Sequence, residues 1–144
     1  MKRYSLIVFL VTALVFLAAC SSEKPKLQLH DPAAFAYLLD NGWELNASVQ
    51  VKGFTQNEND GRYIAKLSYT VNIITPKGDT LEDVDSGIAD KNDKEQIGDM
   101  QINSQIELDS SYATGSYKLI FIVNDDLTEN NTARIEQKFE LSKE

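Results

Sequence analysis

The chain has very few of the residues that most catalytic and metal sites need. It holds one Cys, one His and one Trp among 144 residues. A single Cys excludes an internal disulfide, and one Cys with one His is too few for a structural zinc site. Gly-x-Ser-x-Gly, His-Glu-x-x-His and a glycine-rich phosphate loop are also absent, so the common hydrolase, zinc-protease and nucleotide signatures fail. We therefore expect no enzyme activity, no catalytic residues and no cofactor.

Positive charge is also scarce. Lys and Arg number 14 against 22 Asp and Glu, which gives a formal net charge of −8. Lys2 and Arg3 lie in residues 1–19, so the remainder of the chain is more acidic still. A negative surface repels phosphate backbones, which excludes nucleic acid as the expected partner. The length allows one domain.

Residues 1–19 have the pattern of a secretory signal peptide. After Lys2 and Arg3, residues 6–19 are apolar apart from Thr12. This stretch is too short to span a membrane comfortably, because a bilayer core of about 30 Å needs about 20 helical residues. A basic region, an apolar core and small residues before a break predict an export signal.

The end of this segment, Leu17-Ala18-Ala19-Cys20, resembles the lipobox of bacterial lipoprotein precursors. In that family a diacylglyceryl group is attached to the Cys thiol, and a dedicated peptidase cuts just before it. The resemblance implies that Ala19 is the last residue removed and that Cys20 is the first, lipidated residue of the mature protein. Two or three acyl chains, at about 0.8 kcal/mol per buried CH₂, hold a soluble domain on a membrane. An ordinary cleaved signal followed by a free Cys is the alternative.

The residue after the Cys bears on the destination. Ser21 stands where many inner-membrane lipoproteins of Gram-negative bacteria have Asp. For a Gram-negative source, the resemblance therefore implies the outer membrane, with the domain facing the periplasm. For a Gram-positive source, it implies the outer face of the cytoplasmic membrane. In either case we expect contact with the membrane through the lipid and an envelope protein as partner.

A polar stretch follows the predicted lipidation site. Residues 20–30 show no hydrophobic periodicity, and they predict a flexible tether between Cys20 and one folded domain over residues 31–144. His is the usual general base near neutral pH. Because the only one, His30, falls in this tether, we interpret it as a solvated linker residue.

The start of the domain has a helical pattern. Asp31 and Pro32 are typical of a helix start, as N-cap and first helical residue. Phe35, Leu38 and Leu39 then fall at i, i+3 and i+4. Asn41-Gly42 supplies a stop signal. The pattern predicts a short helix over residues 32–40, with its apolar face packed on the edge of the domain.

After Gly42 the hydrophobic period changes from helical to two. The apolar members of the first run are Trp43, Leu45, Ala47, Val49 and Val51, and those of the second are Tyr63, Ala65, Leu67, Tyr69, Val71 and Ile73. Such alternation predicts strands with one buried and one wet face. Because turn residues fill 57–61, we interpret the two runs as a hairpin.

The second half of the chain also predicts strands. An acidic stretch, 80–95, predicts one short strand near 81–84 followed by a loop. Period two resumes at 100–108, and residues 117–123 are apolar on both faces, which is typical of a central strand. A last strand is expected over 133–141. Strands joined by turns with almost no helix predict an all-β fold, an antiparallel β-sandwich.

Residues 115–125, GSYKLIFIVND, resemble the penultimate strand of immunoglobulin-like domains, including the fibronectin type III and polycystic-kidney-disease-repeat kinds. In those domains a Gly-x-Tyr opens the strand and a Val-x-Asp closes it. The resemblance implies an immunoglobulin-like β-sandwich in which the Tyr117 ring lies in the core and its hydroxyl bonds back to the backbone. The Cys pair of antibody domains is missing and Trp43 lies in the first predicted strand, so the resemblance carries topology and no function.

Acidic residues gather between 79 and 99. Asp83-Val84-Asp85-Ser86-Gly87 is faintly similar to the start of a calcium loop, but the third alternating acid and the bidentate Glu are missing. We interpret the stretch as a solvated loop, assign no metal, and keep Asp83 and Asp85 as weak calcium candidates. A second acidic corner, Asp125-Asp126 with Glu129, is interpreted as shaping the turn into the last strand.

Glycan binding needs exposed aromatic residues in a row. Most aromatic residues fall at inward strand positions or in the signal, and Tyr112 is the one that we expect to be exposed. The leading hypothesis is a non-enzymatic, membrane-tethered domain that binds another envelope component through a sheet edge or its loops. The alternative is a calcium-dependent adhesion or carbohydrate-binding module at the cell surface. A third class, an enzyme with two carboxylates converging from different strands, ranks last.

Overall fold

The computed structural model describes residues 25–143, which form eight strands and no helix. The strands are β1 (Gln28–Leu39), β2 (Gly42–Lys52), β3 (Asn57–Asn59), β4 (Arg62–Ile74), β5 (Thr80–Asp93), β6 (Met100–Asp109), β7 (Gly115–Asp125) and β8 (Thr132–Leu141). No helix long and apolar enough to cross a membrane is found in this part of the chain. Ala19 and Cys20, with the rest of the predicted signal, lie outside the described residues.

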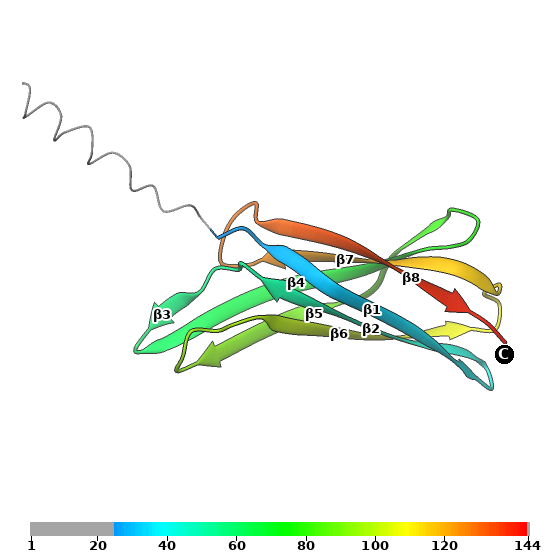
Figure 1. Cartoon of the computed structure of the whole chain (residues 1–144), viewed down its shortest axis with the longest axis horizontal. Coiled ribbons are helices and arrows are strands. Elements are labelled where there is room, and N and C mark those ends of the chain that lie inside the picture. Colours follow the sequence, from blue (N-terminus) through cyan, green and yellow to red (C-terminus); the bar gives the residue numbers. More distant parts are fainter. Residues whose placement is uncertain (1–24, 144) are drawn as a thin grey trace, which may run out of the picture.

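The strands form two antiparallel sheets (Figure 1). The smaller sheet has the order β1-β2-β6. In the larger sheet β4 lies between β5 and β7, β8 pairs with β7, and the short β3 pairs with the start of β4. The prediction of an all-β fold with antiparallel strands is confirmed.

The core lies between the two sheets. Alternate residues of each strand point inward, so the period-two runs of the sequence become two apolar faces that pack on each other. The fully buried side chains include Leu45, Val49 and Val51 from β2, Leu67, Val71 and Ile73 from β4, and Leu119, Phe121 and Val123 from β7. The opposite, outward positions of the same strands are therefore the ones available for binding.

Side-chain hydrogen bonds tie the two sheets together along both flanks. On one flank β1 lies beside β8, and the Leu27 amide donates to Asn131 Oδ1 at 3.0 Å. On the other flank β5 approaches β6, and the Ser104 hydroxyl donates to Asp85 Oδ2 at 2.5 Å. One of the two sheets curls into a half-barrel.

The predicted helix over residues 32–40 is wrong, because these residues belong to β1. Ala34 and Ala36 point inward opposite Ala47 and Leu45 of β2, so the small side chains of this segment face the core. The larger Phe35 is 62% exposed. Asp40 and Asn41 form the two-residue turn of a β-hairpin instead of a helix end, since Leu39 pairs directly with Gly42 across them. Pairing with β2 therefore overrides the local helical pattern.

The tether also ends earlier than the predicted boundary at residue 30. Leu27 is only 3% exposed, and β1 already begins at Gln28. His30 is consequently a strand residue and not a linker residue. It stands at a β-bulge, where the register of β1 against β2 shifts between His30 and Ala33 and Asp31 takes a positive φ of 48°.

Two further strand predictions need correction. The runs at 43–51 and 63–73 are strands, but β2 and β4 lie in different sheets and form no hairpin. β4 instead forms a tight hairpin with β3, whose turn residues Asp60 and Gly61 both have positive φ, as a two-residue turn of this kind requires. The acidic stretch predicted as a loop forms most of β5, because it pairs with β4 along nearly its full length.

The prediction for the start of β7 is confirmed. The Tyr117 side chain is 2% exposed, and its ring stacks on Phe139 of β8 with a centroid separation of 5.4 Å. Its hydroxyl donates to the Ala113 carbonyl at 2.6 Å. The residue thus fastens the loop before β7 to the core, as a tyrosine corner does.

Candidate binding surface

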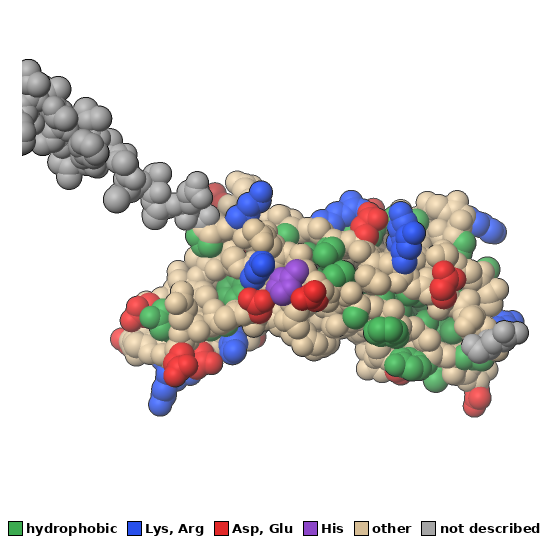
Figure 2. All heavy atoms as spheres, viewed as in Figure 1, with side chains coloured by type: hydrophobic (Ala, Val, Ile, Leu, Met, Phe, Trp, Pro, Cys, Tyr) green, Lys and Arg blue, Asp and Glu red, His purple; other side chains and the backbone are tan. Residues whose placement is uncertain are grey.

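The outward face of the smaller sheet carries a patch of uncharged polar side chains. Opposed pairs across β2 and β6 are Asn46 with Gln105, Ser48 with Asn103, and Gln50 with Gln101, and we call these residues the amide face. They lie outward because their strand neighbours, such as Leu45 and Ile106, fill the core. Figure 2 views this side of the molecule, where the neutral surface is tan and lies beside green hydrophobic side chains.

The outward side of β1 is apolar where it borders the amide face. Ala33, Phe35, Tyr37 and Leu39 stand opposite Ser48, Asn46, Glu44 and Gly42, and we call the four β1 residues the β1 ridge. Phe35 is 62% exposed and Tyr37 is 57% exposed. A contiguous exposed apolar patch bordered by polar residues is typical of an interaction site. The ridge and the amide face together form one surface over three strands.

A shallow hollow of about 540 Å³ lies within this surface. Ala33 and Ser48 are small and leave space, while Phe35, Asn103 and Gln105 border it. The hollow has the size of many small-molecule sites, and its lining combines one aromatic ring with a few amides, as such sites do.

The amides are partly engaged with one another. Gln50 Nε2 donates to Gln101 Oε1 at 3.1 Å, and Gln101 Nε2 donates to Asn103 Oδ1 at 2.7 Å. Each amide has two N–H donors and an oxygen with two lone pairs, so these bonds leave hydrogen-bonding capacity on the exposed side. The network fixes side-chain positions while it keeps groups available to a ligand.

One end of the amide face carries two carboxylates. Glu44 and Glu107 are directly opposed across β2 and β6, an arrangement that repulsion between like charges disfavours. Hydrogen bonds from Asn46, at 2.8 Å, and from Gln105 lower the pKa of Glu44 and so stabilise its charged form. The two acids come from different strands, as the alternative of an enzyme with two converging carboxylates supposed. They stand, however, on an open sheet face.

The other end carries the His30 cluster. His30 Nδ1 lies 2.8 Å from Asp31 Oδ2, and Nε2 lies 2.8 Å from Asp99 Oδ2. Both carboxylates favour the protonated ring and so raise the pKa of His30. The hydrogen bond to Asp31 makes the largest contribution. In Figure 2 the purple His side chain stands between red acidic ones.

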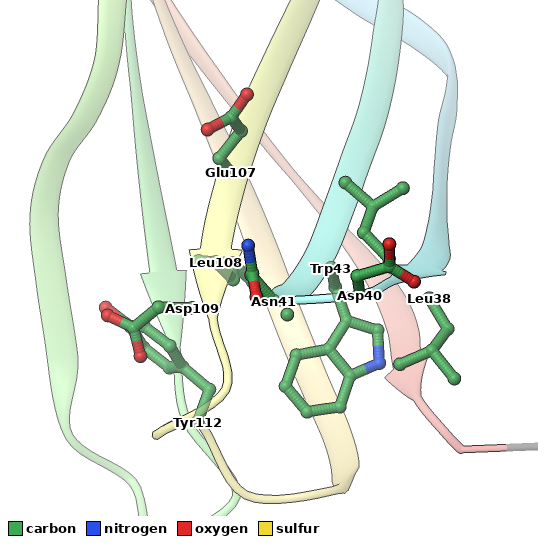
Figure 3. A pocket seen from close by; sticks show the side chains of 10 residues that line it. Leu38, Asp40, Asn41, Trp43, Glu107, Leu108, Asp109 and Tyr112 are labelled. Carbon is green, nitrogen blue, oxygen red and sulfur yellow. The ribbon is translucent and has the colours of Figure 1, made fainter.

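A second hollow, of about 750 Å³, lies at the end of the sheet beside the β1–β2 turn. Figure 3 shows Tyr112 and Asp109 on one side of the Trp43 indole and Leu38 on the other. Trp43 itself is 2% exposed and its indole N–H donates to the Ser142 carbonyl at 3.1 Å, so it belongs to the core. Tyr112, expected to be exposed, is half-buried against the same core.

The acidic residues singled out in the sequence lie apart from this surface. Asp83 and Asp85 are in β5, where Asp85 accepts from Ser104. Among residues 25–143, no group of three or more His, Cys, Asp or Glu side chains is placed to hold a metal ion. Asp125 is 4% exposed and accepts from the backbone amides of Thr55 and Leu127 at 2.7 and 3.1 Å. The interpretation that this corner shapes the turn into β8 is confirmed.

Sequence reasoning missed the surface that the structure displays. Its polar half was visible in the alternation, because Asn46, Ser48 and Gln50 occupy the wet positions of the 43–51 run. Its aromatic half was hidden, since the helical interpretation of residues 32–40 placed Phe35 on a packed face. Only the strand register of β1 brings Phe35 and Tyr37 beside the amides.

Comparisons with solved structures give a distant likeness. No family model matches the chain, and no curated protein does. Among solved structures, part of a family 123 glycoside hydrolase from Clostridium perfringens, described in a study of glycolipid glycan hydrolysis, aligns with a TM-score of 0.48 and 13% identity. The alignment covers 81% of this chain and 27% of the hydrolase, so the chain spans about a quarter of that protein. A likeness at this level carries no argument about function.

Proposed function

We propose that the chain is a lipid-anchored, non-enzymatic binding domain of the bacterial cell envelope, which binds through the amide face and the β1 ridge. The observation that carries the binding role is the exposure of Phe35 and Tyr37, at 62% and 57%, beside an uncharged polar sheet face. Exposing two aromatic rings has a cost in solubility, which a ligand that covers them offsets.

The location in the cell envelope is proposed from the sequence. The export signal and the lipobox resemblance at Leu17-Ala18-Ala19-Cys20 support cleavage before Cys20 and acylation of its thiol. Residues 21–26 then link the lipid to Leu27, the first buried residue of the described part. Six residues reach at most about 20 Å even when fully extended, which keeps the domain close to the lipid headgroups.

We also propose an immunoglobulin-like topology of the fibronectin type III kind. It is supported by the strand order β1-β2-β6 in one sheet and β5-β4-β7-β8 in the other, an arrangement in which consecutive strands cross between sheets as in a Greek key. The bond from Tyr117 Oη to the Ala113 carbonyl supports it independently. A scaffold of this kind leaves function to its exposed faces and loops.

The proposal is tested in living cells with the full-length chain. Wild type and Cys20→Ser are compared by membrane fractionation, and a photoreactive amino acid is placed at position 37 or, as the control, at position 88. Ile88 is as exposed as Phe35, at 62%, but lies in β5 of the larger sheet. We expect membrane association that Cys20→Ser abolishes, and cross-linked adducts from position 37 only.

Two results would contradict the proposal. Membrane association that persists unchanged in Cys20→Ser removes the lipid anchor. The absence of adducts at position 37, or equal adducts at positions 37 and 88, removes the binding surface.

A further inference from the structure

We propose that the ligand of the amide face and the β1 ridge is an uncharged polysaccharide chain. This inference rests on the proposed function and names the class of partner for the same surface. It follows from the charge, the aromatic spacing and the hydrogen-bonding groups of that surface, which are argued in turn below.

The charge distribution on this surface argues against a ligand with a high net charge of either sign. The amide face itself has no charged side chain, although a quarter of the chain is charged. Glu44 and Glu107 stand at one of its ends, and at the other Asp31 and Asp99 stand with His30 and the exposed Lys52. A polyanion such as a uronic-acid polymer would meet Glu44 and Glu107 at one end, and neither a polyanion nor a polycation would find an opposite charge along the middle of the surface.

The outward side of β8, in the larger sheet, is charged where the amide face is neutral. On β8 the outward positions are occupied by Arg134, Glu136 and Lys138, all exposed. Glu136 Oε1 lies 2.8 Å from Arg134 Nη2, and Glu136 Oε2 lies 3.6 Å from Lys118 Nζ. The outward positions of β8 are thus charged where those of the amide face are not, although the middle of β4 also carries uncharged outward residues, Ser68, Thr70 and Asn72.

The aromatic residues have a spacing that suits a chain of repeating rings. Phe35 and Tyr37 are two residues apart on one strand, which places them about 6.7 Å apart along β1 on the same side. The electron-rich face of an aromatic ring attracts the weakly positive C–H groups of a sugar ring. A polysaccharide running along β1 can therefore place successive sugars on successive aromatic rings.

The amides stand where the hydroxyl groups of such sugars would point. Phe35, Asn46 and Gln105 form one row across the three strands, about 10 Å from end to end. An amide both donates and accepts, so it matches a hydroxyl group in either role. The hollow of about 540 Å³ extends over this row and the neighbouring row of Ala33, Ser48 and Asn103. It gives room for one sugar unit between Phe35 and Asn103.

The test measures retardation in native gels that contain a polysaccharide. The full-length chain is purified from membranes in a polyoxyethylene detergent, which has no sugar headgroup to compete. The gels contain dextran, xyloglucan, glucomannan or galactomannan as uncharged probes, and polygalacturonate as the charged one. We expect at least one uncharged probe to retard the wild type and polygalacturonate to leave its mobility unchanged.

Substitutions on the two sheets give the matched comparison. Phe35→Ala, Tyr37→Ala and Gln105→Ala each weaken the retardation about tenfold or more, since each removes a central contact. Ile88→Ala, equally exposed but on β5, leaves it unchanged. Unchanged urea midpoints for all four variants show that the fold is intact.

The outcomes separate this inference from the proposed function. Three results would overturn the proposal of an uncharged polysaccharide. They are the absence of retardation by every uncharged probe, retardation by polygalacturonate as strong as by the uncharged probes, and equal retardation of wild type and Phe35→Ala. A dimer in sedimentation velocity that Phe35→Ala dissociates assigns the surface to a second copy and also overturns it. If one of these results is obtained but adducts still form at position 37 in cells, the binding surface is supported and only the polysaccharide ligand is contradicted.

Discussion

Strands β1 and β7 are both rich in apolar residues, but the fold uses them in opposite ways. β7 lies between β4 and β8, and even its outward Ile120 is only 3% exposed. β1 is the outer strand of its sheet and leaves Phe35 62% exposed. An apolar run therefore contributes to stability in a central strand, whereas at this edge it leaves an exposed apolar surface, which we propose binds a ligand.

The neighbours of each strand explain the difference. Ile120 stands in register with Asn72 on one side and Glu136 on the other, and Glu136 is paired with Lys118 and Arg134. Long charged side chains bury their aliphatic stems along apolar surface, which accounts for the burial of Ile120. Phe35 is paired with a strand on one side only, and its partner there is the short Asn46, which covers little of the ring.

The largest expected effect comes from truncating one Phe in each strand. Phe121→Ala in β7 removes a fully buried ring and should lower the free energy of unfolding by about 3–5 kcal/mol. Phe35→Ala in β1 should change it by no more than about 0.5 kcal/mol, because the ring is already in contact with water. Urea denaturation of both variants and wild type measures the difference.

A comparable loss of stability in both variants would contradict the assignment of β1 to binding. It would show that Phe35 packs in the folded state as the core residues do, and the contrast between the two strands would disappear.

A smaller effect is expected from removing a hydroxyl group in each strand. Tyr117→Phe removes the hydrogen bond to the Ala113 carbonyl and should cost about 1 kcal/mol, the usual net value of such a bond. Tyr37→Phe serves as the matched control on the exposed ridge and should change stability by less than about 0.5 kcal/mol. Thermal unfolding of both variants is the measurement, and equal shifts in Tm would argue against a tyrosine corner.

The smallest effect concerns pH and is confined to the beginning of β1. The pKa of His30 is raised above 6.5 by Asp31 first and then by Asp99. Because the folded-state pKa exceeds the unfolded value, the stabilisation is fully present below pH 6.5 and is lost as pH rises through the folded pKa. Titration of the imidazole proton by NMR should show this raised pKa, while amide resonances of β7 stay unchanged over the same range.

Two variants sharpen this test. Asp31→Asn should lower the pKa of His30 more than Asp99→Asn does, because the bond to Asp31 is the larger cause. A wild-type pKa at or below 6.5 would be incompatible with the two bonds at 2.8 Å.

The predictability of each segment depended on which side chains are large. In β2 and β6 the inward residues are bulky, as Leu45 and Ile102 illustrate, so period two was visible in the sequence. In the middle of β1 the inward residues are the small Ala34 and Ala36, while the bulky Phe35 and Tyr37 point outward. When both sides of a strand carry apolar residues, the sequence shows no alternation of period two. The helical spacing of Phe35, Leu38 and Leu39 was therefore the stronger pattern, and it led to the wrong prediction.

By itself the sequence determined the antiparallel all-β class, the positions of most strands and the role of Tyr117, since alternation and turn residues act locally. The export signal and Cys20 are likewise encoded in a short stretch, and they remain predictions. Only the tertiary structure decided which strands pair, that β2 and β4 separate into different sheets, and that β1 is a strand at all. Pairing joins residues far apart in the chain, so the surface formed by Phe35, Asn46 and Gln105 exists only after three strands have met.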